Sequence, residues 1–151
     1  RRTIEQMRAT LRAWNRYGHV PLVVVDYLQI VQGAAESGST RERVVSKIAE
    51  DLKIMAKEFD CHVLALAQLS RDGAERPTMA HLRESGGIEA HADNIGLLHR
   101  DESRPDEIDV DYVKNRHGAT QLLTLAWRPQ FSSANTMGGS GRSYAFGMEN
   151  K

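Results

Sequence analysis

The chain has almost no cysteine, since Cys61 is the only one in 151 residues. A single thiol excludes an internal disulfide and every zinc site built from several cysteines. It suits the reducing cytoplasm, so the sequence predicts a cytoplasmic protein. No apolar run approaches the roughly 20 residues of a membrane-spanning helix, which predicts a globular domain outside the membrane.

An excess of charge of one sign is also lacking. Lys and Arg number 20, and Asp and Glu number 20. This balance neither supports nor excludes nucleic-acid binding, because a local basic loop would not show in the total. The chain is long enough for one domain with a substantial core. We assign residues 1–131 to that domain and 132–151 to a tail, whose Ser- and Gly-rich part at 132–143 is predicted to be flexible.

One continuous apolar run, Leu22-Val23-Val24-Val25, leads directly into Asp26. Such a run predicts a strand that is buried on both faces, as in a parallel sheet covered by helices. In open α/β sheets, ligands bind at the carboxyl ends of the strands, where Asp26 stands. A carboxylate there can hold Mg²⁺, and it can equally cap a turn.

The remaining pattern alternates helices and strands. Helical spacing of apolar residues predicts helices over 3–16 and over 41–59, the second with Thr40 as its N-cap. A second buried strand is predicted at 63–67, a short helical turn at 77–83 that Gly86 and Gly87 end, and three further strands at 95–99, 108–114 and 122–127. Trp14 and Trp127 fall in apolar patterns and are predicted to be packing residues. The fold class is α/β, with antiparallel strands at one edge.

Three more polar clusters could carry chemistry. Gln68 follows the strand at 63–67, and Lys114 and Arg116 follow the strand at 108–114. The turn Arg83-Glu84-Ser85-Gly86-Gly87 combines a cation with glycines that let a backbone approach a phosphate closely. Each cluster also has a plain interpretation as solvated surface.

Taken together, these clusters resemble the successive motifs of the DnaB-type replicative helicases over residues 3–127. The motifs are Asp26-Tyr27-Leu28-Gln29, Ala67-Gln68-Leu69-Ser70-Arg71, Leu82-Arg83-Glu84-Ser85-Gly86, Ala92-Asp93, Arg100-Asp101-Glu102 and Lys114-Asn115-Arg116-His117-Gly118. The resemblance implies part of a RecA-like P-loop NTPase core, with a central, mostly parallel sheet flanked by helices. It also implies an ATP- and Mg²⁺-dependent helicase that forms a hexameric ring of identical subunits around single-stranded DNA, with primase and a helicase loader as further partners.

The resemblance also implies roles for single residues. Asp26 would be the Walker B acid on Mg²⁺, through water, and Gln68 would sense the γ-phosphate. Arg83, Glu84 and Gly86 would lie in the loop that follows the DNA backbone. Lys114 and Arg116 would be the basic pair that enters the ATP site of the neighbouring subunit.

The sequence departs from the family pattern in two ways. His81 and His91 stand where the family tends to have acids, and we interpret them as surface histidines, since a metal site would need a third ligand. The chain also lacks a phosphate loop with lysine. Residues 33–40 imitate its glycine spacing, but Ser39 stands where Lys is required. We therefore expect the true loop upstream of Arg1, and the isolated chain to be inactive.

Two functions remain open on the sequence alone. The first is the carboxyl-side part of a helicase motor. The second is a DNA-binding or helicase-interacting module that never hydrolyses ATP. A RecA-type recombinase is a third interpretation, which the Arg-Glu-Ser-Gly and Lys-Asn-Arg-x-Gly segments disfavour.

Overall fold

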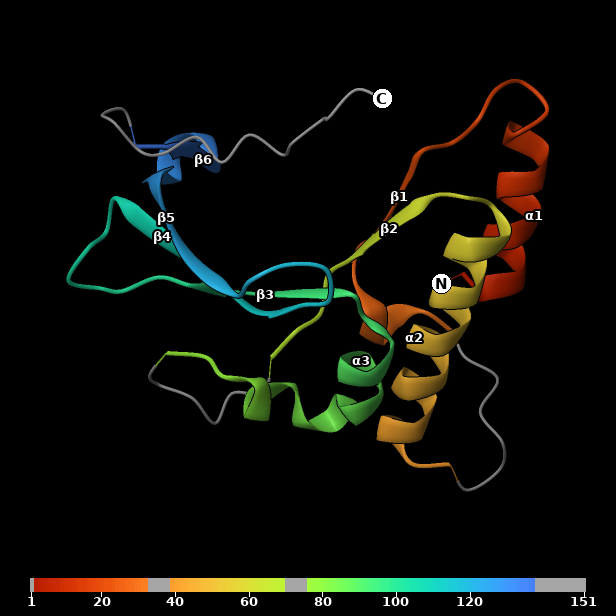
Figure 1. Ribbon diagram of the computed structural model, residues 1–151, viewed down its shortest axis with the longest axis horizontal. Coiled ribbons are helices and arrows are strands. Elements are labelled where there is room, and N and C mark those ends of the chain that lie inside the picture. Colours follow the sequence, from red (N-terminus) through yellow and green to blue (C-terminus); the bar gives the residue numbers. More distant parts are fainter. Residues whose placement is uncertain (1, 33–38, 70–75, 138–151) are drawn as a thin grey trace.

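The structure is a computed structural model that describes residues 2–32, 39–69 and 76–137, with backbone only at 83–85. Figure 1 shows the longer helices on one side of the molecule and an antiparallel sheet extending from the other. The elements, with η for short 3₁₀ helices, are α1 (Ile4–Trp14), β1 (Leu22–Val25), η1 (Leu28–Ile30), α2 (Arg41–Glu58), β2 (His62–Ala65), η2 (Met79–Ser85), α3 (Gly86–His91), β3 (Asn94–His99), β4 (Glu107–Asn115), β5 (Gln121–Arg128), η3 (Pro129–Phe131) and β6 (Ser133–Thr136).

Side-chain caps fix where the two longest helices begin. The hydroxyl of Thr3 accepts a hydrogen bond from the Gln6 backbone N at 3.2 Å, and the Gln6 side chain accepts one from the Thr3 backbone N at 3.0 Å. This reciprocal pair is a capping box. Thr40 caps α2, as predicted, by accepting a hydrogen bond from the Arg43 backbone N. Both helices therefore start at positions that the sequence marks.

The main core lies between α1, α2 and the strand pair. The predicted apolar stripe of α2 is confirmed, since Ile48, Leu52 and Met55 are almost fully buried. The prediction for Trp14 is wrong, because its side chain is 59% exposed. Trp14 lies on the last turn of α1 and lines a pocket between that helix and β1 instead of packing into the core.

Strands β1 and β2 form a parallel pair in which Leu22 lies opposite His62 and Val25 opposite Ala65. Val23 and Val25 pack against the core, whereas the side chains of Leu22 and Val24 are 50% and 58% exposed. The predicted burial on both faces is therefore wrong. The described part of the chain packs helices against one face of this pair, so alternate side chains remain exposed on the other.

Strands β3 to β6 form a separate antiparallel sheet in the order β3-β4-β5-β6. The three strands predicted in this region are confirmed to within one residue at each end. The predicted mostly parallel central sheet is wrong, because β1 and β2 are the one parallel pair of strands among the described residues. The connections from β3 to β4 and from β4 to β5 are short, and a parallel pairing needs a crossover of about a dozen residues or more.

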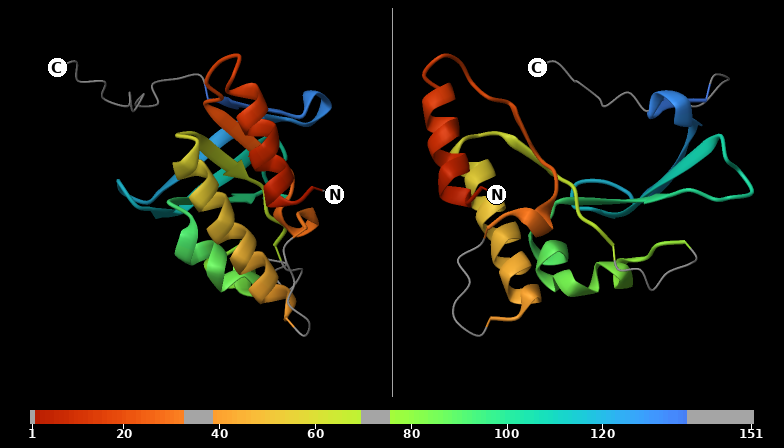
Figure 2. Two further views of the ribbon diagram at one scale, coloured as in Figure 1. Left: turned by 90° about the vertical axis from the view of Figure 1, so that its right-hand side faces the viewer. Right: turned by 180° about the vertical axis from the view of Figure 1, so that it is seen from behind.

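Gly86 and Gly87 begin α3, although the sequence predicts that they end a helical turn. Their role is close packing. A Cβ on Gly87 would lie 1.9 Å from the Ser46 hydroxyl oxygen on α2, so only glycine lets α3 approach that helix. The views of Figure 2 show α3 beside α2 from two further directions.

The carboxyl-terminal segment starts differently from the sequence prediction. Composition predicts flexibility from residue 132, but Ser133–Thr136 pair with β5 as strand β6. Residues 138–151 lie outside the described part, as do residues 33–38 of the segment that imitates a phosphate loop. No helix in the described ranges is both long enough and apolar enough to cross a membrane.

Candidate functional site

The carboxyl ends of β1 and β2 bring two of the predicted site residues to the same edge. Asp26 follows the last residue of β1 with an exposed side chain, and Gln68 lies three residues beyond β2. Gln29 joins the two segments, because its side-chain Nε2 donates to the Gln68 carbonyl at 3.0 Å and its Oε1 accepts from the Gln68 backbone N at 3.3 Å. The amide of Gln29 thus fixes the backbone of Gln68 beside the loop that begins at Asp26.

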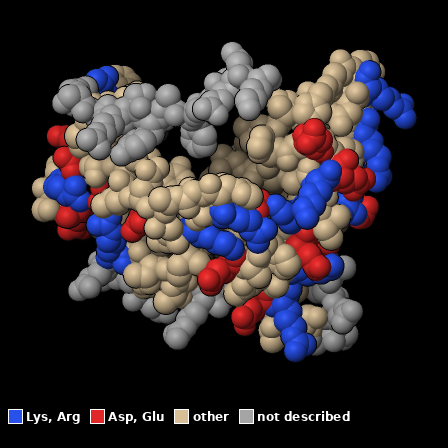
Figure 3. Space-filling view, in the orientation of Figure 1, with Lys and Arg blue, Asp and Glu red and all other residues tan. Residues whose placement is uncertain are grey.

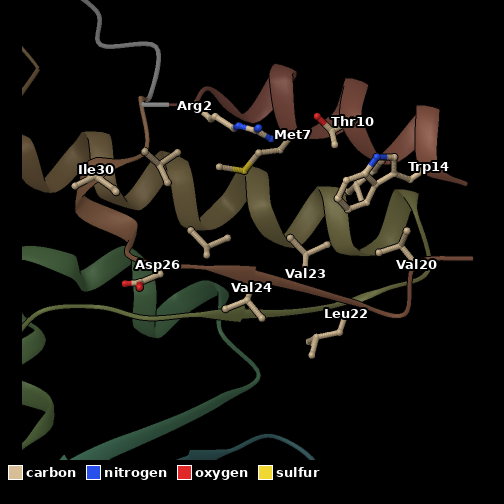
Figure 4. Close-up of a pocket in the computed structure, with 13 residues that line it drawn as sticks. Arg2, Met7, Thr10, Trp14, Val20, Leu22, Val23, Val24, Asp26 and Ile30 are labelled. Carbon is tan, nitrogen blue, oxygen red and sulfur yellow. The ribbon is translucent and has the colours of Figure 1, made fainter. Parts of the chain in front are cut away.

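A pocket of about 460 Å³ lies between α1 and β1, with Asp26 at one end. Figure 4 shows Met7, Thr10 and Trp14 of α1 on one side and Val23 of β1 on the other. The lining is mainly apolar. Gln68 does not line this pocket, so the pocket is distinct from the edge that Asp26 and Gln68 share.

The predicted basic pair lies at the end of β4, in the other sheet. The Lys114 ammonium donates to the carbonyl oxygen of Glu89 on α3. The Arg116 backbone N donates to the Asp93 carbonyl at 2.9 Å, and its guanidinium Nη1 lies 3.4 Å from Asp93 Oδ1. The Arg116 side chain is 48% exposed, so much of its guanidinium group can meet another molecule.

The turn after β4 fixes the direction in which Arg116 leaves the sheet. The Asn115 side chain donates to the Ala119 carbonyl at 3.0 Å and accepts from the His117 backbone N at 3.3 Å. A Cβ on Gly118 would lie 2.8 Å from Asn115 Nδ2, which explains the glycine in this tight turn.

Asp93 is the acid that interacts with Arg116 of this pair, and it also contacts a third cation, Lys53. The Lys53 ammonium donates to its Oδ2, while Arg116 faces its Oδ1. The hydrogen bond from Lys53 is the main cause that lowers the pKa of Asp93, and the charges of Lys53 and Arg116 act in the same direction against partial desolvation. Asp93 is therefore ionised at neutral pH. The sequence places Asp93 in a family motif but predicts none of these contacts.

The third predicted cluster leads into α3. The structure places the backbone of Arg83 and Glu84 in η2 and that of Gly86 at the first position of α3. The side chains of Arg83 and Glu84, and the residues Ser70 and Arg71, lie outside the described part, so their roles stay predictions. His81 precedes them, and its Nδ1 accepts a hydrogen bond from the Thr78 backbone N at 2.8 Å.

A buried carboxylate on β4 is absent from the sequence predictions. Asp109 is only 2% exposed and accepts hydrogen bonds from the Thr124 hydroxyl at 2.7 Å, from Arg104 at 2.9 Å and from Arg76 at 3.3 Å. The Thr124 hydroxyl and then Arg104 lower the pKa of Asp109, more than burial raises it. Arg76 lies just before η2, so Asp109 ties the segment that leads to Arg83 onto the sheet. The sequence signal that could have identified Asp109 is an acid placed between the apolar residues Ile108 and Val110 of a predicted strand.

Charges of both signs are interspersed over the face of the molecule in Figure 3. This mixture agrees with the balanced composition. Any attraction of this chain for a polyanion must therefore come from local groups and not from the chain's net charge.

Solved structures place this fold in the class of helicase ATPase domains, which are RecA-like. One of them, described as an ATPase domain, matches with a TM-score of 0.82 and 32% identity, over 90% of this chain and 52% of that one. A second, described as a DnaB-like replicative helicase and its interactions with primase, matches with a TM-score of 0.82 and 31% identity, over 90% of this chain and 36% of that one.

The chain belongs to the family of the DnaB-like helicase C terminal domain, whose model matches residues 1–135. The replicative DNA helicase DnaC of Bacillus subtilis is 34% identical over 140 residues, which cover 85% of this chain and 31% of the relative. A probable replicative DNA helicase of Trieres chinensis is 44% identical over 126 residues, which cover 75% of this chain and 28% of the relative. The chain thus spans under a third of the length of these two relatives.

Proposed function

We propose that this chain is the carboxyl-side part of the motor domain of a hexameric, ATP-dependent replicative DNA helicase. The observation that carries the proposal is that two polar clusters lie at strand ends of different sheets. Asp26 and Gln68 follow the two strands of the parallel pair, while Lys114 and Arg116 lie at the carboxyl end of β4 in the antiparallel sheet. A ring would bring the first site of one subunit against the second site of its neighbour.

The strand-end edge fits Mg²⁺ and the phosphates of ATP. Mg²⁺ takes oxygen ligands, keeps several waters and is usually held through one or two carboxylates together with substrate phosphates. The exposed carboxylate of Asp26 suits this mode, and nowhere in the described residues do three His, Cys, Asp or Glu side chains group as a protein cage would. Asp26 would hold the ion through water. When bound, Mg²⁺ neutralises charge on the phosphoryl oxygens.

The remaining residues of the proposal act by position and charge. Gln68 would sense the γ-phosphate from the strand end, where Gln29 holds its backbone. Lys114 and Arg116 would reach the ATP of the next subunit and stabilise the negative charge of the transition state. Arg83, Glu84 and Gly86 would form the loop that follows the phosphates of single-stranded DNA, without reading bases.

The proposal includes partners and a place in the cell. The ring would consist of identical subunits, and primase is a candidate partner because a structural relative is described with it. A loader would place the ring on DNA. Residues 1–131 would form the motor part, to which the paired strand β6 of the following segment adds, and the residues after β6 would be a tail. Such a protein would work in the cytoplasm of a bacterium or of a phage-infected cell.

A second candidate is a DNA-binding or helicase-interacting module that does not hydrolyse ATP. The observation in its favour is that residues 1–151 contain no phosphate loop with lysine. The gene decides between the two. An in-frame Gly-x-x-x-x-Gly-Lys-Ser/Thr segment upstream of Arg1 supports the motor. A start codon directly before the codon of Arg1 supports the module.

The activity test uses Asp26→Asn in the full-length protein. We expect loss of DNA-stimulated ATP hydrolysis with hexamers intact, because an amide cannot supply the charge that Mg²⁺ needs. Asp106→Asn is the matched control, since Asp106 is another exposed acid but lies in the turn before β4. The proposal fails if the wild-type protein does not hydrolyse ATP, or if both variants behave alike.

A further inference from the structure

One residue, Asp93, contacts Arg116 through both its backbone and its side chain. Asp93 lies between α3 and β3, and its carbonyl accepts the Arg116 backbone N–H at 2.9 Å. Its carboxylate Oδ1 lies 3.4 Å from the Arg116 Nη1. Asp93 therefore restrains both the point where Arg116 leaves the strand and the direction of its guanidinium group.

The same carboxylate is itself anchored to a buried helix. Its Oδ2 accepts a hydrogen bond from Lys53 on α2, between the buried residues Leu52 and Met55. Asp93 thus connects the end of β4 to the rigid core of the domain. A side chain that must enter another subunit gains precision when its support cannot move.

The geometry lets Asp93 orient Arg116 without neutralising it. A guanidinium group has five N–H donors in a planar fork, and this contact engages one nitrogen at a long distance. Half of the Arg116 side chain stays exposed. Asp93 also shares its single negative charge between two cations, so the group of three keeps a net positive charge that favours a phosphate.

We propose that Asp93 is the positioning residue for Arg116. It holds the guanidinium group of one subunit in the direction of the ATP bound by the next. The inference rests on the proposed function, because it needs Arg116 to act in trans. The competing explanation is purely structural. Asp93 would join α2 to β3 through Lys53, and Arg116 would only pack beside the Asp93 carboxylate without being oriented by it.

The test measures steady-state ATP hydrolysis by full-length rings that carry Asp93→Asn. We expect kcat to fall about 10- to 100-fold, the scale of a misplaced catalytic group, with KM for ATP within about 3-fold. Asp111→Asn is the matched control, because Asp111 has the same 33% side-chain exposure and also faces an arginine, Arg76. That control should keep its kcat.

A second variant separates positioning from bracing. Lys53→Met removes the link to α2 but leaves Asp93 beside Arg116. We expect its kcat to fall by less than that of Asp93→Asn, because Asp93 keeps both contacts with Arg116 and loses only its anchor to the core, although the melting temperature falls. If Lys53→Met lowers kcat as much as Asp93→Asn does, Asp93 acts as a brace and the inference is overturned. If Asp93→Asn does not form rings, Asp93→Glu takes its place, with the same expected loss of kcat.

Mixed rings show on which side of the interface Asp93 acts. Subunits with Asp93→Asn keep their own ATP site, so adding Asp26→Asn subunits, whose Arg116 and Asp93 are intact, should raise the rate per Asp93→Asn subunit. Absence of a rise at every mixing ratio overturns the inference. Arg116→Ala rings are assayed in parallel. Normal hydrolysis by those rings refutes the proposed function, whereas their loss together with a normal Asp93→Asn rate refutes the inference alone.

Discussion

Replacing Arg116 by alanine should abolish ATP hydrolysis in the ring while ATP binding stays within a few-fold. Arginines that act in this way on the transferred phosphoryl group contribute roughly 10³–10⁵ in rate. This range corresponds to about 4–7 kcal/mol of activation free energy. The charge that Arg116 meets develops mainly in the transition state, so kcat should fall much more than KM rises.

The structure predicts a far smaller effect of the same substitution on folding. Arg116 is half exposed, and its ion pair with Asp93 spans 3.4 Å between partly solvated groups. Pairs of this kind contribute about 0–1 kcal/mol. Asp93 keeps its hydrogen bond from Lys53, so the substitution strands no unpaired carboxylate. A large loss of rate with a small loss of stability is therefore the expected signature.

The decisive assay mixes Arg116→Ala subunits with Asp26→Asn subunits. Each parent ring should be inactive, since one lacks the trans arginine and the other lacks the acid of the ATP site. In a random equal mixture, about a quarter of the interfaces join an intact site to an intact Arg116, so hydrolysis should return and peak near that ratio. If no mixing ratio restores hydrolysis, Arg116 does not act in trans. If Arg116→Ala unfolds the protein, its role is structural.

Two further outcomes follow from the same structure. Arg83→Ala should weaken single-stranded DNA binding equally for different sequences and reduce the salt dependence by about one phosphate's share in each engaged subunit, while hydrolysis without DNA survives. A lower melting temperature with an unchanged salt slope would instead identify Arg83 as a brace for its loop. Asp109→Asn should lower the free energy of unfolding by about 2 kcal/mol at pH 7, because it breaks a buried pair whose arginines are partly exposed and can regain water. The folded protein lowers the pKa of Asp109, so its contribution is present above the unfolded pKa of about 3.9 and is lost as pH falls through the lower folded value. Urea titrations should show this difference from wild type shrinking in acid, and a difference that does not depend on pH would contradict the assignment.

Local pattern was enough to predict most of the elements. The apolar stripe of α2 repeats at the helical period and Thr40 can cap it, so neighbouring residues alone specify that helix. Strands β3, β4 and β5 alternate or run apolar over lengths that helices rarely have, and the structure confirms them. The positions of Asp26 and Gln68 at strand ends follow from the same local reasoning. Their convergence on one edge follows from the parallel pairing of β1 and β2.

The predictions that were wrong concern contacts between distant segments. Nothing local says that β3 to β6 form a sheet of their own, apart from β1 and β2. Trp14 fits an apolar pattern, yet whether it is buried depends on what packs against the end of α1. Glycine usually ends helices, but Gly87 lies in the first turn of α3. Only a residue without a side chain fits there, because α3 passes close to Ser46 of α2.

The sequence by itself determined the family motifs, most of the helices and strands, and the residue types that could carry the chemistry, because these depend on neighbours along the chain. Only the tertiary structure decided that Asp93 meets both Lys53 and Arg116, and that Asp109 is buried between two arginines. Lys53 and Asp93 are 40 residues apart, and Arg76 and Asp109 are 33 apart. No periodicity reports such a pair. The two pairs exist because distant segments pack together, α2 beside α3 and the start of β3 in one case, and the segment before η2 against β4 in the other. A carboxylate in such a place is stable only when cations or hydroxyls surround it.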